Sequence, residues 1–162
     1  MAKDIYANND LENGKRVESI NIAGNNTITM ISKFKTAADD GNGSIYRLFE
    51  VGANMIPISI KVMCEAGSAS TDYDLGIFEG SKGKAIDADK LADGLSLSTA
   101  KGVGSELNGL GALGIADIGK KIYELAGATE ANKATGYEIG LTANTASTTA
   151  INIVVIATFA QG

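Results

Sequence analysis

The chain has 162 residues, a formal net charge of −5 and no histidine. This length suits one domain with one core, and 14 basic residues against 19 acidic ones provide no cationic footprint for a phosphate backbone. The chain lacks histidine, the most common general acid or base in enzymes. With four Phe, five Tyr and no Trp, it also has few aromatic side chains on which a base or a sugar could stack. We therefore expect no enzyme activity, no catalytic residue, no cofactor or metal, and no nucleic-acid partner.

The N-terminal part, residues 1–43, is polar and rich in asparagine and turn-forming dipeptides. Two short strands are predicted within it, at 19–22 and at 27–32, with an Asn/Gly turn between them. We interpret this part as an arm with short strands, followed by a β-sandwich over 44–162, within a single domain overall. Its first ten residues contain no apolar stretch that could act as a secretory signal, so we expect folding in a reducing cytoplasm.

Three strands are predicted next, at 44–51, 56–65 and 73–79. The second strand alternates, which indicates one buried face and one solvated face. Its expected buried residues are Ile56, Ile58, Ile60, Val62 and Cys64, and its expected outer residues are Ser59, Lys61 and Met63. Pro57, the only proline, suits an edge strand or the first position of a strand, where no ladder donor is lost.

Cys64 is the only cysteine, so no disulfide can form within the chain. Its place in the apolar register of a strand favours a small buried hydrophobic residue over a reactive thiol, which needs exposure and a positive neighbourhood.

Residues 80–119 differ in composition from the strands before them: they are rich in Gly, Ala, Ser, Leu and Asp and show no sustained alternation of apolar and polar residues. We interpret them as one long Gly/Ala-rich excursion, a natural contact surface in a binding protein. Short helices are predicted within and after it, at 88–94 and 120–125.

The last two predicted strands are 137–144 and 151–159. The second is β-branched and nearly continuously apolar, which favours a central strand covered on both sides. Its apolar run 153–157 is far too short to span a bilayer, so no membrane anchor is expected.

One sequence echo links the strands: residues 73–77 and 137–141 both read Tyr, acid, aliphatic, Gly, aliphatic. The echo fits two similarly placed strands of a sandwich, and chance recurrence of a short strand motif is the alternative. A glycine inside a strand can mark a bulge or the close approach of another backbone.

Acidic groups occur at two places. Asp87, Asp89 and Asp93 resemble a calcium loop only weakly, because Leu91 and Ala92 occupy positions that need a ligand and a glycine. A solvated acidic turn with an aspartate as helix cap is the better interpretation. Asp72 and Asp74 could share one strand face as an acid–base pair, but paired carboxylates alone are weak support for catalysis.

Two glycine-rich stretches are superficially like nucleotide-binding motifs. Residues 102–107 begin like a dinucleotide fingerprint but have Leu107 where its third glycine belongs. Residues 114–120 have a Gly-x4-Gly-Lys frame, but Lys121 stands where a magnesium-binding Ser or Thr is required. Nucleotide binding is therefore not predicted.

The chain resembles small structural proteins of tailed bacteriophages over about residues 28–160. The stretches that carry the resemblance are 28–41, 44–49, 56–62, 71–77, 85–94 and 137–144.

The nearest class that the resemblance suggests is the capsid decoration, or cement, proteins. It implies an all-β, jelly-roll-like antiparallel sandwich that binds the outside of the major capsid protein as a homodimer or homotrimer. The protein would brace the shell and locate to the virion exterior after assembly in the host cytoplasm.

If the arm docks on a capsid neighbour, its anchors should be its few apolar residues and its basic pair. These candidates are Ile5, Tyr6, Leu11, Lys15 and Arg16. The alternative is that Ile5 and Tyr6 cover their own sandwich.

The competing function is a carbohydrate- or receptor-binding jelly-roll module of a phage fibre or another surface structure. That class usually needs exposed aromatic platforms, whereas Tyr46, Tyr73 and Tyr137 lie in strand patterns. A hydrolase on the same fold ranks last, since it would depend on unsupported aspartate pairs.

Overall fold

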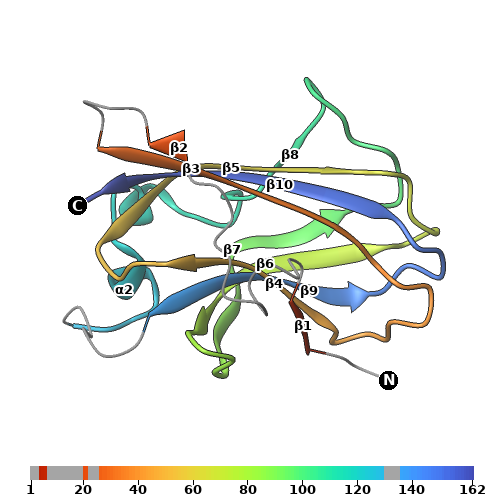
Figure 1. Ribbon diagram of the computed structural model, residues 1–162, viewed down its shortest axis with the longest axis horizontal. Helices are drawn as coiled ribbons and strands as arrows, with labels where there is room; N and C mark the ends of the chain where they lie inside the picture. Colours follow the sequence, from red (N-terminus) through yellow and green to blue (C-terminus); the bar gives the residue numbers. More distant parts are fainter. Residues whose placement is uncertain (1–3, 7–19, 22–25, 130–135) are drawn as a thin grey trace.

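The structure of the chain is a computed structural model that describes residues 4–6, 20–21, 26–129 and 136–162. Two sheets pack face to face, with sheet B as the upper layer and sheet A as the lower layer in Figure 1. In spatial order, sheet A contains β1 (Asp4–Tyr6), β4 (Ile45–Val51), β9 (Tyr137–Thr145), β6 (Asp72–Glu79) and β7 (Ala85–Ser96). Sheet B contains β2 (Ile20–Asn21), β3 (Thr27–Lys35), β10 (Asn152–Gln161), β5 (Met55–Cys64) and β8 (Leu107–Asn108).

The strands β3 to β10 form a jelly roll. They alternate between the two sheets along the chain, except that β6 and β7 form a hairpin within sheet A. The resulting order β3-β10-β5-β8 faces β4-β9-β6-β7, with every neighbouring pair antiparallel. This is the arrangement of an eight-stranded double Greek key, so the predicted all-β, jelly-roll-like sandwich is confirmed.

The core lies between the sheets and consists of the inward residues of each strand. Phe159 of β10, Tyr73 of β6 and Leu141 of β9 are completely buried there. Near one end of the core, the ring of Phe34 stacks on that of Tyr46, with 5.1 Å between their centroids.

β5 differs from its predicted alternation before residue 59. Ile58 is 55% exposed and Ile56 is only half-buried, while Pro57 is buried between them. Thr158 pairs with Ser59 and Phe159 pairs with Pro57, so Ile58 is the extra residue of a β-bulge. The bulge shifts the phase of the strand by one residue, and the expectation that Ile56 and Ile58 are buried was therefore wrong. Cys64, at the end of this strand, is buried as predicted.

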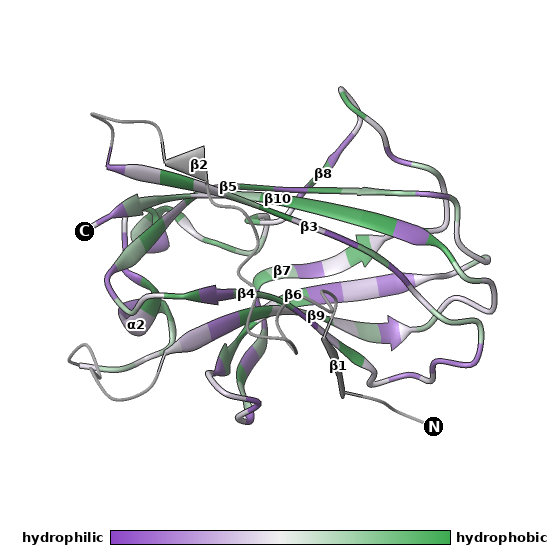
Figure 2. Cartoon of the chain, in the orientation of Figure 1, coloured by the Kyte–Doolittle hydropathy of each residue, from purple (hydrophilic) through white to green (hydrophobic). Residues whose placement is uncertain are grey.

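β10 is central in sheet B, as predicted, because it pairs with β3 on one side and with β5 on the other. It is not covered on both faces, however. Ile153, Val155 and Phe159 are completely buried, whereas the alternate residues Val154 and Ile156 are only half-buried. The continuous apolar run therefore packs on the core with one face and leaves apolar surface on the outer face of sheet B, where Figure 2 shows β10 largely hydrophobic.

The helix predicted at 88–94 is wrong, since these residues belong to strand β7. Leu75 pairs with Ala92 and Ile77 pairs with Asp87, so residues 88–91 bulge out of the ladder and hide the period-two pattern from sequence inspection. Tertiary pairing with β6 decides the conformation here. The helix predicted near 120–125 is present as α2 (Ile122–Leu125), which buries Ile122 and Leu125.

The sandwich begins before residue 44, where the boundary of the arm was expected. β3 pairs with β10 from Thr27↔Ala160 to Lys35↔Asn152 and contributes Phe34 to the core. β2 extends the same sheet by pairing with Ile28 and Thr29.

Candidate functional site

The N-terminal candidates are placed only in part. Ile5 and Tyr6 lie in β1, whose backbone pairs in parallel with β4, at Tyr46 and Arg47 respectively. Leu11, Lys15 and Arg16 lie outside the described residues. β1 thus borders the chain's own sheet A, and a docking role of these five residues stays a prediction.

Residues 80–119, expected as one long excursion, contain the strands β7 and β8, and the turns outside these strands carry exposed aliphatic side chains. Val103 is 94% exposed between β7 and β8, a connection that rises above sheet B in Figure 1. Ile115, in the 3-10 helix η1 (Ile115–Asp117), is 96% exposed, and Ile118 just after it is 68% exposed. Ile115 and Ile118 are therefore close neighbours in the sequence, whereas Val103 is a single exposed side chain on another turn.

The acidic residues 87, 89 and 93 belong to β7, so they do not form a helix-capping turn. The side chain of Asp89 hydrogen-bonds Asp87 and, together with partial burial, raises the pKa of Asp87. Among the described residues, no group of three or more acidic or thiol side chains could hold a metal ion.

Asp72 and Asp74 both point toward Gly94 of β7. The amide of Gly94 donates a hydrogen bond of 2.9 Å to Oδ1 of Asp74, and Oδ1 of Asp72 lies 3.9 Å from the position of a Cβ on Gly94. Gly94 has a left-handed φ of +72°. The carboxylate of Asp74 therefore fixes the bent backbone of β7, which is a structural task.

The two glycine-rich stretches form turns without a phosphate cradle. Residues 102–105 form a turn in which the amide of Ser105 donates to the carbonyl of Gly102 at 3.0 Å. In the second stretch, Nζ of Lys120 pairs with Asp117 at 2.8 Å, and the helix that follows has only four residues. A phosphate loop instead directs its lysine to the ligand and leads into a longer helix.

A polar cluster closes one end of the sandwich. The Tyr46 hydroxyl donates a short hydrogen bond to Asp40, and the amide of Ala37 donates to the same carboxylate oxygen at 2.9 Å. Tyr46 and Asp40 are both buried, and burial together with the adjacent carboxylate raises the pKa of Tyr46. The cluster ties the turn after β3 to β4.

A buried ion pair lies on the outer face of sheet A. Nη1 of Arg47 on β4 is 2.7 Å from Oε2 of Glu138 on β9, and their side chains are 2% and 8% exposed. The guanidinium lies over the ring of Phe78 on β6, 4.7 Å from its centroid. Phe78 is completely buried but does not belong to the hydrophobic core between the sheets. The three residues Arg47, Glu138 and Phe78 thus combine a charge-assisted hydrogen bond with a cation–π contact, and they are here called the outer cluster.

The outer cluster is covered by the β6–β7 hairpin loop, residues 80–84. Nη2 of Arg47 donates a hydrogen bond of 2.7 Å to the carbonyl oxygen of Gly83, and Nη1 donates one of 3.4 Å to the carbonyl oxygen of Glu79. The amide of Gly80 donates 2.8 Å to the carbonyl of Gly136. The loop is thus held at both ends of its turn.

Sequence reasoning missed the outer cluster. Arg47 and Glu138 are 91 residues apart, and each interrupts an apolar strand pattern at a position facing away from the core. A charged residue amid apolar neighbours was the available signal, but nothing in the sequence indicated which partner it meets.

No helix of the described residues is long and apolar enough to cross a membrane. A scan against known protein families finds no match, and a search of curated proteins finds none.

Two solved structures are similar to this chain in fold. A chain of the structure titled "Capsid of Ralstonia phage GP4" superposes with a TM-score of 0.61 at 13% identity, over 97% of this chain and 95% of that one. A chain of "Cyanophage Pam1 capsid asymmetric unit" superposes with a TM-score of 0.53 at 12% identity, over 91% of this chain and 94% of that one. At these identities the similarity is one of fold, and it extends over nearly the full length of all three chains.

Proposed function

We propose that the chain is a structural virion protein, a decoration or cement protein that binds the outside of a tailed-phage capsid and braces contacts between major capsid subunits. One observation carries the proposal: two chains from phage capsid structures share the fold over more than nine-tenths of their lengths and of this one. Because a fold alone hosts many functions, the proposal also depends on what the surface offers.

The surface favours a role in binding other proteins. The described part of the chain presents exposed aliphatic residues on ordered turns, at Val103, Ile115 and Ile118. It also carries apolar surface on the outer face of sheet B, with Ile31 and Ile58 exposed by 42% and 55%. Such surfaces are typical of contacts between proteins.

The burial of the aromatic residues weighs against a carbohydrate-binding module. All four Phe are buried, and so are Tyr46, Tyr73 and Tyr137, while Tyr123 is half-buried. Among the described side chains, therefore, no fully exposed aromatic ring offers a platform for a sugar. The carboxylate of Asp74 accepts a hydrogen bond from the backbone of Gly94, which supports a structural task for this residue over a catalytic one.

The test is binding of the purified full chain to capsids from which this protein has been stripped. Saturable binding at a fixed ratio to capsid subunits, with a rise in the temperature at which the shells rupture, is the expected result. A chain lacking residues 1–18 should bind more weakly if the predicted anchors act. Absence of binding to capsids, together with retention on a glycan array or on host cells, would replace the proposal with the receptor-binding alternative. Light scattering of the free protein measures the proposed dimer or trimer.

A further inference from the structure

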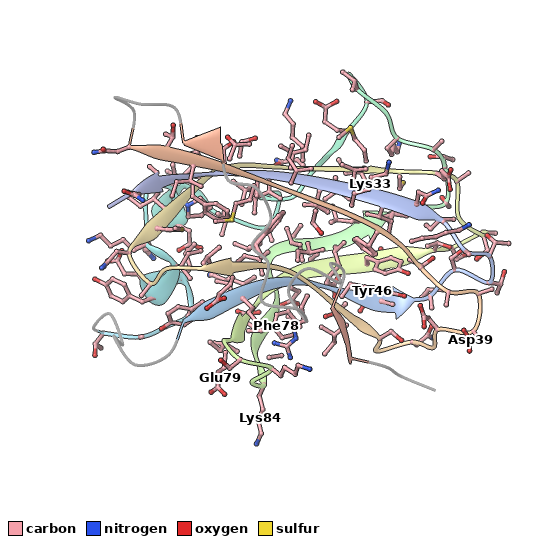
Figure 3. All side chains as sticks on the ribbon, viewed as in Figure 1. Lys33, Asp39, Tyr46, Phe78, Glu79 and Lys84 are labelled. Atoms are coloured by element: carbon pink, nitrogen blue, oxygen red, sulfur yellow. The ribbon has the colours of Figure 1, made fainter. Side chains whose placement is uncertain are left out.

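The β6–β7 hairpin projects from the outer face of sheet A. Figure 3 shows Lys84 extending from its end, away from the body of the sandwich, with Glu79 beside its base. Ser81, Lys82 and Lys84 are exposed. Figure 2 shows this projection as predominantly hydrophilic, in contrast to the strands of sheet B.

The tip of the hairpin has an unusual backbone. Ser81 and Lys82 have φ angles of +56° and +67°, and the amide of Gly83 donates 3.3 Å to the carbonyl of Gly80. Two successive left-handed residues closed by this bond form a type I′ turn, whose central positions favour Asn and Gly. Ser and Lys persist there only because the surroundings hold them in that conformation.

The outer cluster supplies that restraint. Arg47 directs its donors to the carbonyls of Glu79 and Gly83, at the two ends of the turn, and Glu138 holds the guanidinium in place. Glycine is required at residues 80 and 83, because a Cβ on Gly80 would lie 2.5 Å from the carbonyl oxygen of Gly136 and one on Gly83 would overlap the Glu79 side chain.

A buried ion pair adds little net stability compared with apolar residues of similar size. An arginine that is almost fully buried, yet directs its donors to a surface loop, is therefore better explained as a positioning residue for that loop. Preorganising a contact element in this way reduces the entropy lost on binding.

We infer that the hairpin 80–84 is a rigid, cationic contact element that docks on an acidic patch of the major capsid protein. The inference rests on the proposed function and names the contact. The charge of the loop favours an acidic partner, because its ionisable residues are Lys82 and Lys84, while Glu79, which is also exposed, lies at its base. Arg47 acts through the backbone of the hairpin and does not touch the partner.

The first test compares two single charge reversals in the full chain. Lys84→Glu changes the hairpin, and Lys35→Glu changes an exposed lysine at the end of β3 in the other sheet, beyond the apolar surface around Ile31 and Ile58. Both alter the net charge by the same amount. In binding to stripped capsids, Lys84→Glu should weaken affinity by about tenfold and Lys35→Glu by less than about twofold. The loss of affinity in Lys84→Glu should shrink as the salt concentration is raised from about 50 to about 300 mM, because salt screens the interaction between exposed charges.

The second test separates the position of the lysines from their charge. The double variant Arg47→Met with Glu138→Met keeps both lysines and removes the ion pair as a whole, so that neither Arg47 nor Glu138 is left buried without the other. We expect a folded chain whose amides at 80–84 exchange hydrogen faster and whose affinity for capsids falls by several fold.

The outcomes are distinct. If the unmodified chain binds capsids and Lys84→Glu binds as tightly as Lys35→Glu, the hairpin is not the contact and the proposed function stands. If the double variant loosens the hairpin without weakening binding, preorganisation by Arg47 is refuted. If the unmodified chain does not bind capsids at all, both the proposed function and this contact are overturned.

Discussion

Gly76 of β6 and Gly140 of β9 are direct partners in the ladder of sheet A. The backbone of Ala88 passes over Gly76, and a Cβ on Gly140 would lie 2.9 Å from Cε2 of Phe78. The two absent side chains therefore make room on the outer face of the sheet, one for the bulge of β7 and the other for the outer cluster. The echoed motif thus lies on two adjacent strands of one sheet, where the sequence analysis expected only two similarly placed strands, and its glycine at residue 76 marks the close approach of a backbone.

Replacement of Gly76 by alanine should destabilise the fold. The new methyl group would overlap the backbone of Ala88, which must move, and overpacking of this kind costs about 1–3 kcal/mol. Gly102→Ala is the matched control, because nothing lies within 4 Å of a Cβ there. Urea unfolding of both variants measures the difference, and equal midpoints would contradict the packing described.

Replacement of Arg47 alone by methionine should cost about 3–5 kcal/mol of unfolding free energy, since it leaves the carboxylate of Glu138 buried without its partner. The double variant with Glu138→Met should recover most of that loss. Denaturant unfolding of the two single variants and the double variant gives the coupling energy. Additive effects would show that the two side chains do not act as a pair.

Replacement of Tyr46 by phenylalanine removes the hydroxyl that donates to Asp40. Leaving a buried carboxylate oxygen without this donor should lower the unfolding free energy by about 1–3 kcal/mol. Tyr123→Phe, at a half-buried tyrosine of α2, should change it by less than about 0.5 kcal/mol. If thermal unfolding shifts equally for both variants, the Tyr46 hydroxyl does not stabilise this end of the sandwich.

Lys61 should control the titration of Glu106. Hydrogen bonds from Lys61 and from backbone amides lower the pKa of Glu106 to about 2 from an ordinary 4.5. Since the folded-state pKa is the lower one, the contribution of this pair is present above pH 4.5 and is lost as the pH falls toward 2. NMR titration should show the pKa of Glu106 rising in Lys61→Gln, and an unchanged value would mean that the backbone amides alone set it.

Cys64 should be inert in the folded chain. Its thiol is buried, it donates to the carbonyl of Thr99 over 3.6 Å, and burial raises its pKa. Iodoacetamide should therefore alkylate the native protein on the order of a hundredfold more slowly than the urea-unfolded protein. Mass spectrometry measures both rates, and comparable rates would contradict the burial of the thiol.

Local patterns predicted most of the strands, because alternation and β-branched residues report burial of one face directly. They failed where a bulge changes the phase, at Ile58 of β5 and at residues 88–91 of β7. The outer cluster lay beyond sequence reasoning for another reason: Arg47 meets Glu138 only because β4 and β9 are neighbours, and that neighbourhood is a property of the whole topology. The hairpin 80–84 appeared in the sequence only as the start of a long excursion.

The central position of β10 has a consequence for how the protein is made. Both of its neighbours in sheet B, β3 and β5, leave the ribosome before it, and these two strands do not pair with each other in the finished sheet. A nascent chain that has not yet reached residue 152 therefore holds two strands with no strand to link them. The completion of sheet B, and of the core that it closes, should therefore wait for the synthesis of β10.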